Sequence, residues 1–441
     1  MKTIKSLTEE ELAELPKLPE EWKWARLGEI HILKSEKHTG SGESLFYVGL
    51  EHIKKDRGTL TEFVKIDVIN TVKNSFKVGD LLYGKLRPYL NKVYLANEDG
   101  VCSTDILVFE SNPSLNLNYS KYFFLSYKFV NDMTHNSSGV NLPRVSTKYL
   151  LEYPFPLCPL PEQRAIVSKI ELLFSELDNG IANLKLAQEQ LKVYRQAVLD
   201  KTTKTEMFAP INTIIDELGQ GWSPKCHNEP SINSEEWGVI KTTAIQAGYF
   251  NEKENKKLPA DLEPRVKHEL KAGDILITRA GPRVRVGVCC LIKKVRPRLI
   301  NCDKAYRIRL KGDLISPQFF EYILSSPKYA RMMENLKTGI SDSGVNLTQN
   351  RFLDLEIPLP PLTEQYAIVQ EIETRLSVCD KVEQDIEENL IRAEALRQSI
   401  LKKAFEGKLL NEKELVEVRM AEDWEPAEVL LERIRAEKTR K

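Results

Sequence analysis

A stretch that occurs twice constrains the fold of this chain more than any other feature of its sequence. The first copy begins with Pro-Leu-Pro-Glu-Gln at 159–163, and the second begins with Pro-Leu-Thr-Glu-Gln at 361–365. The offset of 202 residues holds without a gap through Leu199 and Leu401. An ungapped repeat of roughly forty residues is what two matched long helices leave in a sequence. The repeat therefore predicts a duplicated architecture.

Both copies are predicted to be helical. A proline just before a run rich in Glu, Gln, Ala and Ile suits a first helical turn, where a missing N–H group removes no hydrogen bond. Each copy carries a mostly apolar series at seven-residue intervals, which indicates the seam of a coiled coil. The two series are Ile170, Leu177, Leu184, Leu191 and Val198, and Ile372, Cys379, Ile386, Ala393 and Ile400. A second row, three residues after members of these series, contains Leu173, Ala187, Tyr194, Val382 and Leu396.

Two helices of equal length, each roughly forty residues and about 60 Å long, would most simply pack against each other. The alternative is a pair of unrelated amphipathic helices in separate cores. The shared register and the shared motif before each helix argue against that alternative.

The predicted long helices divide the chain into five parts. A first globular region at 1–158 precedes the first long helix at 159–206, a second globular region at 207–360 precedes the second long helix at 361–410, and a tail occupies 411–441. Each globular region combines short β-rich runs with one late helix, which predicts an α+β fold with an internal pseudo-two-fold repeat. The expected strands are 44–48, 80–83, 92–96, 105–109, 274–278, 284–292 and 305–310, and the expected late helices are 115–129 and 317–336.

The two globular regions also match each other loosely. Val78–Leu82 corresponds to Ala272–Leu276, each with a central Gly-Asp pair, and Ser-Gly-Val-Asn-Leu occurs at both 138–142 and 343–347. Most of the sequence between these markers differs. Two similar domains whose surface sequences differ predict two related binding sites, each of which recognises a different target.

The distribution of charged residues suggests which kind of ligand these sites bind. The chain has 64 Lys plus Arg and 64 Asp plus Glu, so its net charge gives no information about nucleic acid. Between Ile277 and Lys311, however, eleven basic residues stand against one acid, and a weaker basic segment follows the first Gly-Asp pair. Such basic segments are suited to binding the phosphate backbone of a nucleic acid. The alternative is that they are ordinary solvent-exposed surface. The predicted DNA-binding residues are Lys85, Arg87, Lys92, Arg279, Arg283, Arg285, Lys293 and Lys294.

The sequence contains no recognisable catalytic or metal-binding constellation. It lacks a Gly-x-x-x-x-Gly-Lys phosphate loop and an Asn-Pro-Pro-aromatic segment, and its six histidines are scattered. Cys226 beside His227 is more readily a structural pair than a nucleophile, because adjacency does not orient two side chains. Seven cysteines without a Cys-x-x-Cys pair, and no apolar run long enough to span a membrane, predict a soluble intracellular protein. We expect no catalytic residues and no metal in this chain.

The tail is predicted to form a helix after Asp423, with Pro426 in its first turn and Val429, Leu430 and Ile434 as an apolar stripe. This helix could bind a partner or pack on the first globular region.

The order of globular region, long helix, globular region and long helix closely resembles the DNA-specificity subunit (S subunit, HsdS) of type I restriction-modification systems. Both Glu-Gln motifs, Leu-Pro-Glu-Glu-Trp at 18–22 and Lys-Lys-Ala-Phe-Glu-Gly-Lys-Leu-Leu at 402–410 carry the resemblance. Thr363 departs from the pattern, because Pro161 stands at the equivalent position.

The resemblance implies that two target-recognition domains bind the halves of a split, asymmetric site in double-stranded DNA, and that two antiparallel helices set the gap. It implies two methyltransferase subunits that use S-adenosylmethionine and two ATP- and Mg-dependent restriction subunits, with no cofactor in this chain and a location in a prokaryotic cytoplasm. Two alternatives remain at this stage: a non-catalytic scaffold that links two protein partners through its globular ends, and a single chain that fuses recognition to catalysis.

Overall fold

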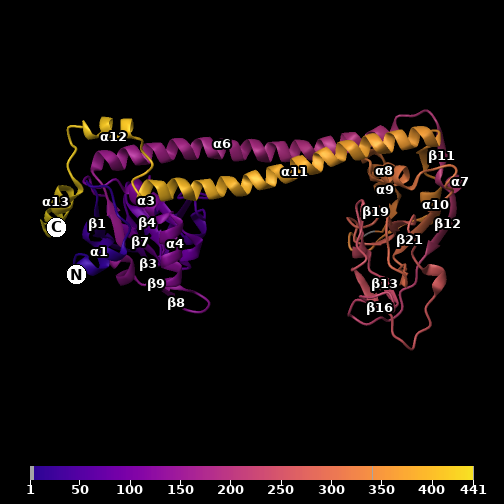
Figure 1. Ribbon diagram of the computed structural model, residues 1–441. Coiled ribbons are helices and arrows are strands. Elements are labelled where there is room, and N and C mark those ends of the chain that lie inside the picture. Colours follow the sequence, from indigo (N-terminus) through magenta and orange to yellow (C-terminus); the bar gives the residue numbers. More distant parts are fainter. Residues whose placement is uncertain (1–3, 340, 441) are drawn as a thin grey trace. The chain divides into compact units, whose positions relative to one another are not determined.

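The computed structural model describes residues 4–339 and 341–440, and the chain divides into two compact units. Unit 1 runs to Asn183 and resumes at Glu388, whereas unit 2 is Leu184–Glu387. The two long helices, α6 (Leu160–Leu199) and α11 (Leu362–Phe405), each contribute one part to each unit (Figure 1). The fold combines mixed α/β domains with two long helices, as predicted.

Unit 1 is built on the three-stranded sheet β5-β4-β7, whose buried central strand Leu-Leu-Tyr-Gly is apolar enough to lie between two layers. A second group of strands, β2, β3 and β6, pairs mutually, and β1 pairs with β10. Helices α3 and α4 supply an aromatic core in which the rings of Phe124 and Phe129 stack 4.7 Å apart. The elements are α1 (Glu9–Glu14), β1 (Lys23–Arg26), α2 (Leu27–Ile30), β2 (Lys37–Val48), β3 (Val64–Phe76), β4 (Leu81–Gly84), β5 (Val93–Leu95), β6 (Gly100–Cys102), β7 (Ile106–Phe109), α3 (Leu117–Phe124), α4 (Tyr127–His135), β8 (Ser137–Ser138), β9 (Arg144–Val145), α5 (Thr147–Glu152) and β10 (Pro154–Leu157).

Unit 2 repeats this plan with the sheet β12-β21-β17-β19, the smaller sheet β16-β13-β20 and the pair β11-β24. Its elements are β11 (Phe208–Pro210), α7 (Ile211–Ile214), β12 (Ile215–Gln220), β13 (Gly238–Ile240), β14 (Ile245–Gln246), β15 (Tyr249–Phe250), β16 (Asn255–Lys257), β17 (Ile275–Thr278), β18 (Ala280–Gly281), β19 (Cys289–Leu291), β20 (Leu299–Ile300), β21 (Ala305–Leu310), α8 (Pro317–Ser325), α9 (Pro327–Leu336), β22 (Lys337–Thr338), β23 (Val345–Leu347), α10 (Gln349–Leu353) and β24 (Glu356–Pro358).

The Gly-Asp pairs make the same turn in both units. Gly79 and Gly273 have φ angles of 85° and 93°, a conformation that favours glycine. The buried carboxylates of Asp80 and Asp274 each accept a hydrogen bond from the backbone N–H three residues earlier, at 2.8 and 2.9 Å. Each turn then leads into the central strand of its sheet, β4 or β17. This part of the predicted correspondence is confirmed.

The second predicted correspondence is wrong. In unit 1 the segment 138–142 forms the exposed turn between β8 and β9, and Val140 is fully exposed. In unit 2 the last three matching residues form strand β23, where Val345 and Leu347 are buried. The structural counterpart of β23 is β9, which keeps the 202-residue offset of the long helices. The repeated letters at 138–142 and 343–347 are therefore a coincidence of sequence.

Each late helix is two helices. Ser126 separates α3 from α4, and Ser326 separates α8 from α9; both serines have extended backbone angles. Pro327 disfavours a helical residue before it, which explains the second break. In the first, the Ser126 hydroxyl donates to the Phe123 carbonyl at 2.7 Å and so replaces a helical bond. The expected strand 284–292 is also shorter, since β19 begins at Cys289.

The seam of the long helices is antiparallel within each unit. In unit 2, Arg195 pairs with Asp380 at 2.7 Å, and in unit 1 the equivalent residues, Arg397 and Asp178, form the reciprocal pair. All five members of the predicted α11 series are buried, as are Ile170 and Val198 of α6.

The more deeply buried second row of the seam lies four residues after the first, although Leu173 and Ala187 of the row predicted three residues after it are half-buried. Tyr194, Val382 and Leu396 are exposed, whereas Phe174 and Arg397 are buried and touch through the Arg397 guanidinium, 4.3 Å from the ring centroid.

The tail forms α12 (Glu412–Arg419), which the sequence did not predict, and α13 (Ala427–Arg440), which it did. Leu430 and Ile434 are buried in the core of unit 1, but Val429 is 48% exposed, so the predicted stripe is partly wrong. The helix therefore packs on the first globular region, one of the two predicted outcomes. Among residues 4–339 and 341–440, no helix is long and apolar enough to cross a bilayer.

Candidate nucleic-acid interface

Two adjoining loops form one end of unit 1, which we call loop end 1. They are residues 85–92, between β4 and β5, and residues 138–144, between β8 and β9. Backbone hydrogen bonds join them: the Val145 N–H donates to Lys85 O at 3.0 Å, and the Arg87 N–H donates to Pro143 O at 2.7 Å. The second loop is therefore held beside the basic segment of the first.

Of the three predicted residues at loop end 1, Arg87 is the most available to a ligand. It is exposed, and no hydrogen bond or ion pair of its guanidinium is found within the described part of the chain. Lys85 is half-buried and likewise without such a partner. Lys92, in contrast, donates to the Ile53 carbonyl, and burial lowers its pKa. The structure thus gives Lys92 a structural role in the free protein.

The backbone of Arg87 is strained. Its φ of 51° places it in the left-handed region, as does the φ of 47° at Asn91. Asn tolerates this conformation, but for Arg it costs about 1 to 2 kcal/mol. The bond from Arg87 N–H to Pro143 O and the following Pro88 hold it there. Strain kept at an exposed cation is typical of a functional position.

Loop end 2 is the equivalent end of unit 2, residues 279–288, 338–339 and 341–345, joined through the pairing of β18 with β23. Here the predicted arginines have protein partners. Arg283 binds Asp342 and Glu334, each at 2.8 Å, and Arg285 donates to the Thr242 carbonyl at 2.8 Å. Arg279 donates Nε–H to Asp303 O at 2.8 Å and lies 5.7 Å above the Tyr306 ring. The Arg279 N–H donates to Lys304 O at 2.8 Å, and Lys304, which the prediction omitted, is exposed.

Lys293 and Lys294 lie elsewhere. They follow β19, whose end at Leu291 pairs with Ile275 at the start of β17, whereas Arg279 follows the end of that strand. Both lysines are exposed. The structure therefore does not bring them together with Arg279, Arg283 and Arg285.

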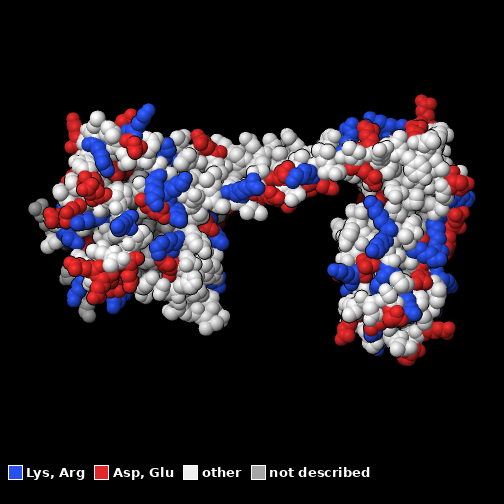
Figure 2. All heavy atoms as spheres, viewed as in Figure 1, with Lys and Arg blue, Asp and Glu red and all other residues white. Residues whose placement is uncertain are grey.

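Much of the basic run in unit 2 is neutralised within the fold. Arg309 binds Asp274 and Glu217, each at 2.8 Å, and Arg307 is buried against Glu217. Arg298 pairs with Glu235 at 3.3 Å. Figure 2 shows Lys and Arg interspersed with Asp and Glu over unit 2. The excess of basic residues in the sequence therefore overstates the positive charge available to DNA.

Arg87→Gly is expected to weaken DNA binding by the full complex by about five- to hundredfold, the range for one specific contact. Glycine adopts positive φ readily, so the free energy of unfolding should stay within about 1 kcal/mol of wild type. Titration of labelled DNA and urea unfolding measure the two effects. Arg298→Gly is the matched control, because Arg298 has a φ of 61° but lies away from loop end 2. Unchanged DNA affinity of Arg87→Gly would exclude the predicted role.

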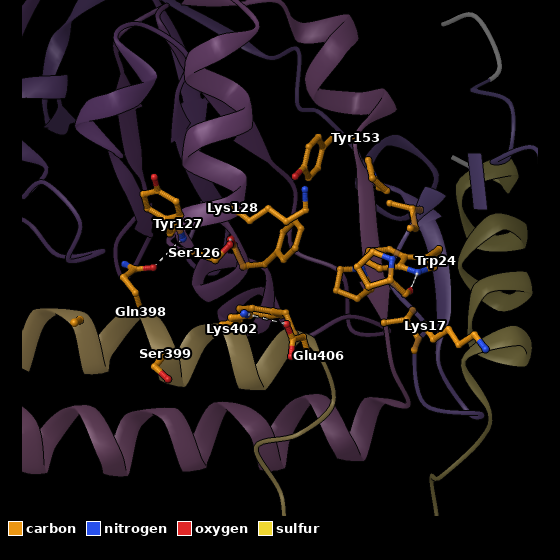
Figure 3. A pocket seen from close by; sticks show the side chains of 18 residues that line it. Lys17, Trp24, Ser126, Tyr127, Lys128, Tyr153, Gln398, Ser399, Lys402 and Glu406 are labelled. Atoms are coloured by element: carbon orange, nitrogen blue, oxygen red, sulfur yellow. Dashed lines mark hydrogen bonds and ion pairs between the residues drawn. The ribbon is translucent and has the colours of Figure 1, made fainter. Parts of the chain in front are cut away.

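Unit 1 also contains a cavity of about 540 Å³ between the N-terminal segment, α4, β10 and the end of α11 (Figure 3). Apolar groups form most of its wall, including those of Trp24, Phe123 and Pro156. At its margin Lys128 pairs with Asp132 at 3.0 Å, and Lys402 lies 3.8 Å from Glu406. The lining suits an apolar group and not a phosphate backbone.

The described residues offer little for covalent chemistry. Burial raises the pKa of the Cys226 thiol, and it raises the pKa of Cys289 to about 12. Both effects disfavour the thiolate, the nucleophilic form. Within 4–339 and 341–440, no group of three His, Cys, Asp or Glu side chains is placed to hold a metal ion.

Known proteins resemble this chain in both sequence and fold. Residues 19–186 match the family described as type I restriction modification DNA specificity domain. The specificity subunit of the Escherichia coli enzyme EcoEI is 42% identical over 172 residues, which are 39% of this chain and 29% of that subunit. The EcoKI specificity subunit of Escherichia coli K12 is 29% identical over 335 residues, 72% of this chain and 71% of that subunit.

Two solved structures share the fold. The HsdS subunit from Thermoanaerobacter tengcongensis has a TM-score of 0.63 and 20% identity, covering 90% of this chain and 99% of that one. A chain from a structure on complex assembly and conformational transition of the type I R-M system has a TM-score of 0.71 and 20% identity, covering 90% and 100%. Residues 19–186 thus match the type I restriction modification DNA specificity domain, the similar sequences are specificity subunits of type I restriction enzymes, and the chain shares the fold of the two solved structures.

Proposed function

We propose that this chain binds a bipartite, asymmetric site in double-stranded DNA, one half at each loop end. The observation that carries the proposal is the pair of equivalent loop ends with unlike side chains. Loop end 1 presents an Arg87 guanidinium for which the described residues offer no partner, whereas loop end 2 presents Arg279 beside Lys304 and an Arg283 held by two carboxylates. Equivalent positions with different donors suit two different base sequences.

We further propose that the chain recruits two methyltransferase subunits and two restriction subunits in a prokaryotic cytoplasm. In this proposal the chain itself is not catalytic. S-adenosylmethionine, ATP and Mg²⁺ would bind to the partner subunits, which carry out methylation and cleavage.

Sequencing of adenine methylation tests the proposal in cells that express the partner methyltransferase with or without this chain. A split motif that disappears on deletion of the chain is the expected result, and it would identify both half-sites. Unchanged methylation, with the methyltransferase shown to be expressed, would contradict the proposal.

The apolar cavity of unit 1 favours one alternative, a scaffold that links protein partners. Salt dependence separates the two functions. A protein that binds DNA displaces counterions from the phosphates, and the free-energy gain from this release shrinks as the salt concentration rises, so affinity for DNA falls steeply with salt. A scaffold would show no salt-dependent binding to DNA of any sequence.

A further inference from the structure

The turn between β8 and β9 in unit 1 is apolar and exposed. Val140 is 100% exposed and Leu142 is 46% exposed, and the turn carries no charged residue from Ser138 to Pro143. Figure 1 shows this turn projecting from the body of unit 1, and the projection is white in Figure 2. Exposed apolar side chains at the tip of a charge-free turn are poorly explained by solubility or by packing, so they suggest a ligand.

The turn is nevertheless held firmly at its base. Ser137 pairs with Val145 in the β8-β9 ladder. The Arg144 guanidinium donates two hydrogen bonds to the Asp105 carboxylate, at 3.0 and 3.2 Å. Gly139 has a φ of 111°, and a Cβ there would lie 3.0 Å from the Leu142 carbonyl oxygen, so the turn closes tightly. The fixed base places Val140 and Leu142 at a defined position beside Arg87.

The described residues 341–343 of the corresponding turn in unit 2 are polar. Ser341 and Ser343 hydroxyls lie 2.7 Å apart, and Asp342 binds Arg283 at 2.8 Å. Ile340 follows Gly339 in sequence as Val140 follows Gly139, so the difference between the turns lies in the polar residues 341–343 of unit 2 and in Leu142 of unit 1. A feature present in one unit is expected to specify one half of a bipartite site.

We propose that Val140 and Leu142 enter the major groove at the half-site bound by unit 1 and contact the methyl group of thymine. This inference rests on the proposed function. The C5-methyl of thymine is the apolar group that a base pair presents in the major groove, and small aliphatic side chains recognise it. Arg87, held beside the turn through Pro143, supplies a guanidinium that can read an adjacent guanine or bind a phosphate. The exposed ring of Tyr89 lies in the same loop as Arg87, residues 85–92.

Replacement of thymine by deoxyuridine isolates the methyl group. With the half-sites known from methylation sequencing, the complete methyltransferase complex is titrated with duplexes in which single thymines become deoxyuridine. One substitution in the half-site of unit 1 should weaken binding by the wild-type complex roughly fourfold, the value of one buried methyl group. Val140→Ser or Leu142→Ser should bind both duplexes equally, and the methylation motif should relax at that position only.

Val78→Ser is the matched control, because Val78 is 57% exposed at the opposite end of β4 from loop end 1. It should keep the wild-type preference for thymine. Two variants are used so that the result does not depend on one of them folding, and thermal melting checks both.

Two outcomes distinguish this inference from the proposed function. If a split motif depends on the chain but both serine variants keep the motif and the wild-type thymine preference, the inference is overturned while the proposed function stands. If no split motif depends on the chain, the proposed function itself fails. Loss of preference in the half-site of unit 2 would also overturn the inference.

Discussion

Truncation after Glu425 is expected to destabilise unit 1 by roughly 5 to 8 kcal/mol and to leave unit 2 folded. The truncation removes α13, whose Leu430, Leu431 and Ile434 are buried in the core of unit 1. Each large aliphatic side chain contributes about 1.5 to 3 kcal/mol when fully buried. A loss of this size approaches the whole stability of a typical domain, so unit 1 should be largely unfolded.

Polar contacts of α13 add to this loss. The Lys438 ammonium donates to the carbonyls of Gly28 and His31 at 2.6 and 2.8 Å, and Arg435 binds Glu29 at 2.5 Å. The buried His31 imidazole adds no positive charge of its own to these contacts, because burial lowers its pKa to about 3. Truncation would therefore also leave the buried Glu29 carboxylate without its cation.

Hydrogen exchange resolved by peptide measures the effect in each unit separately. Protection should be lost in β1, α2 and α3 and retained in β17 and β21. Val429→Ala is the control, since this exposed neighbour should change the free energy of unfolding by less than about 0.5 kcal/mol. Equal loss of protection in both units, or none in unit 1, would contradict the prediction.

The duplicated architecture could be predicted because helices leave a periodic record. A seven-residue series identifies one row of the seam whatever the partner, and its α11 members are buried throughout. The second row could not be predicted by counting apolar residues, because Arg397 occupies it. A guanidinium is buried there only because Phe174 and Asp178 cover it, and both are more than 200 residues away in sequence.

The interface was harder to predict for the same reason. When basic and acidic residues are counted along a segment, only acids that are close in sequence are included. In the fold, Glu334 and Asp342 neutralise Arg283, and Glu217 neutralises Arg309. Nor could the sequence distinguish Lys92 from Lys85, since only the fold places the Ile53 carbonyl at the Lys92 ammonium. The strain at Arg87 likewise depends on contacts with Pro143 in a distant loop.

The helix breaks illustrate a different limit. Ser126 stands in a run of aromatic and aliphatic residues that by itself predicts continuous helix, and serine is compatible with a helix interior or a cap. The hydrogen bond from its hydroxyl to Phe123 decides between them. Pro327 could have revealed the second break, because proline restricts the residue before it.

The largest effect expected from a single polar side chain concerns the Gln of both repeated motifs. Gln163 and Gln365 are fully buried at the starts of α6 and α11. Gln163 accepts from Asn116 N–H at 3.0 Å and donates to Cys158 O at 2.8 Å. Gln365 accepts from Ser316 N–H at 2.8 Å and donates to Pro360 O at 2.8 Å. Each amide thus joins a long helix to the loop before the α3 or α8 helix of its unit.

Methionine has similar length and bulk but cannot make these bonds, so Gln163→Met leaves two backbone groups unpaired. Gln365→Met leaves three, because Gln365 also donates to Leu314 O at 2.9 Å. Each unpaired group costs about 1 to 3 kcal/mol, which predicts a loss of about 2 to 6 kcal/mol in unit 1 for Gln163→Met and about 3 to 9 kcal/mol in unit 2 for Gln365→Met. Urea unfolding followed by hydrogen exchange measures each loss, with Gln196→Met on the exposed surface of α6 as the control. Stabilities within about 0.5 kcal/mol of wild type would show that these amides do not stabilise the fold. The motif would then have to be explained by something other than the hydrogen bonds it makes within each unit.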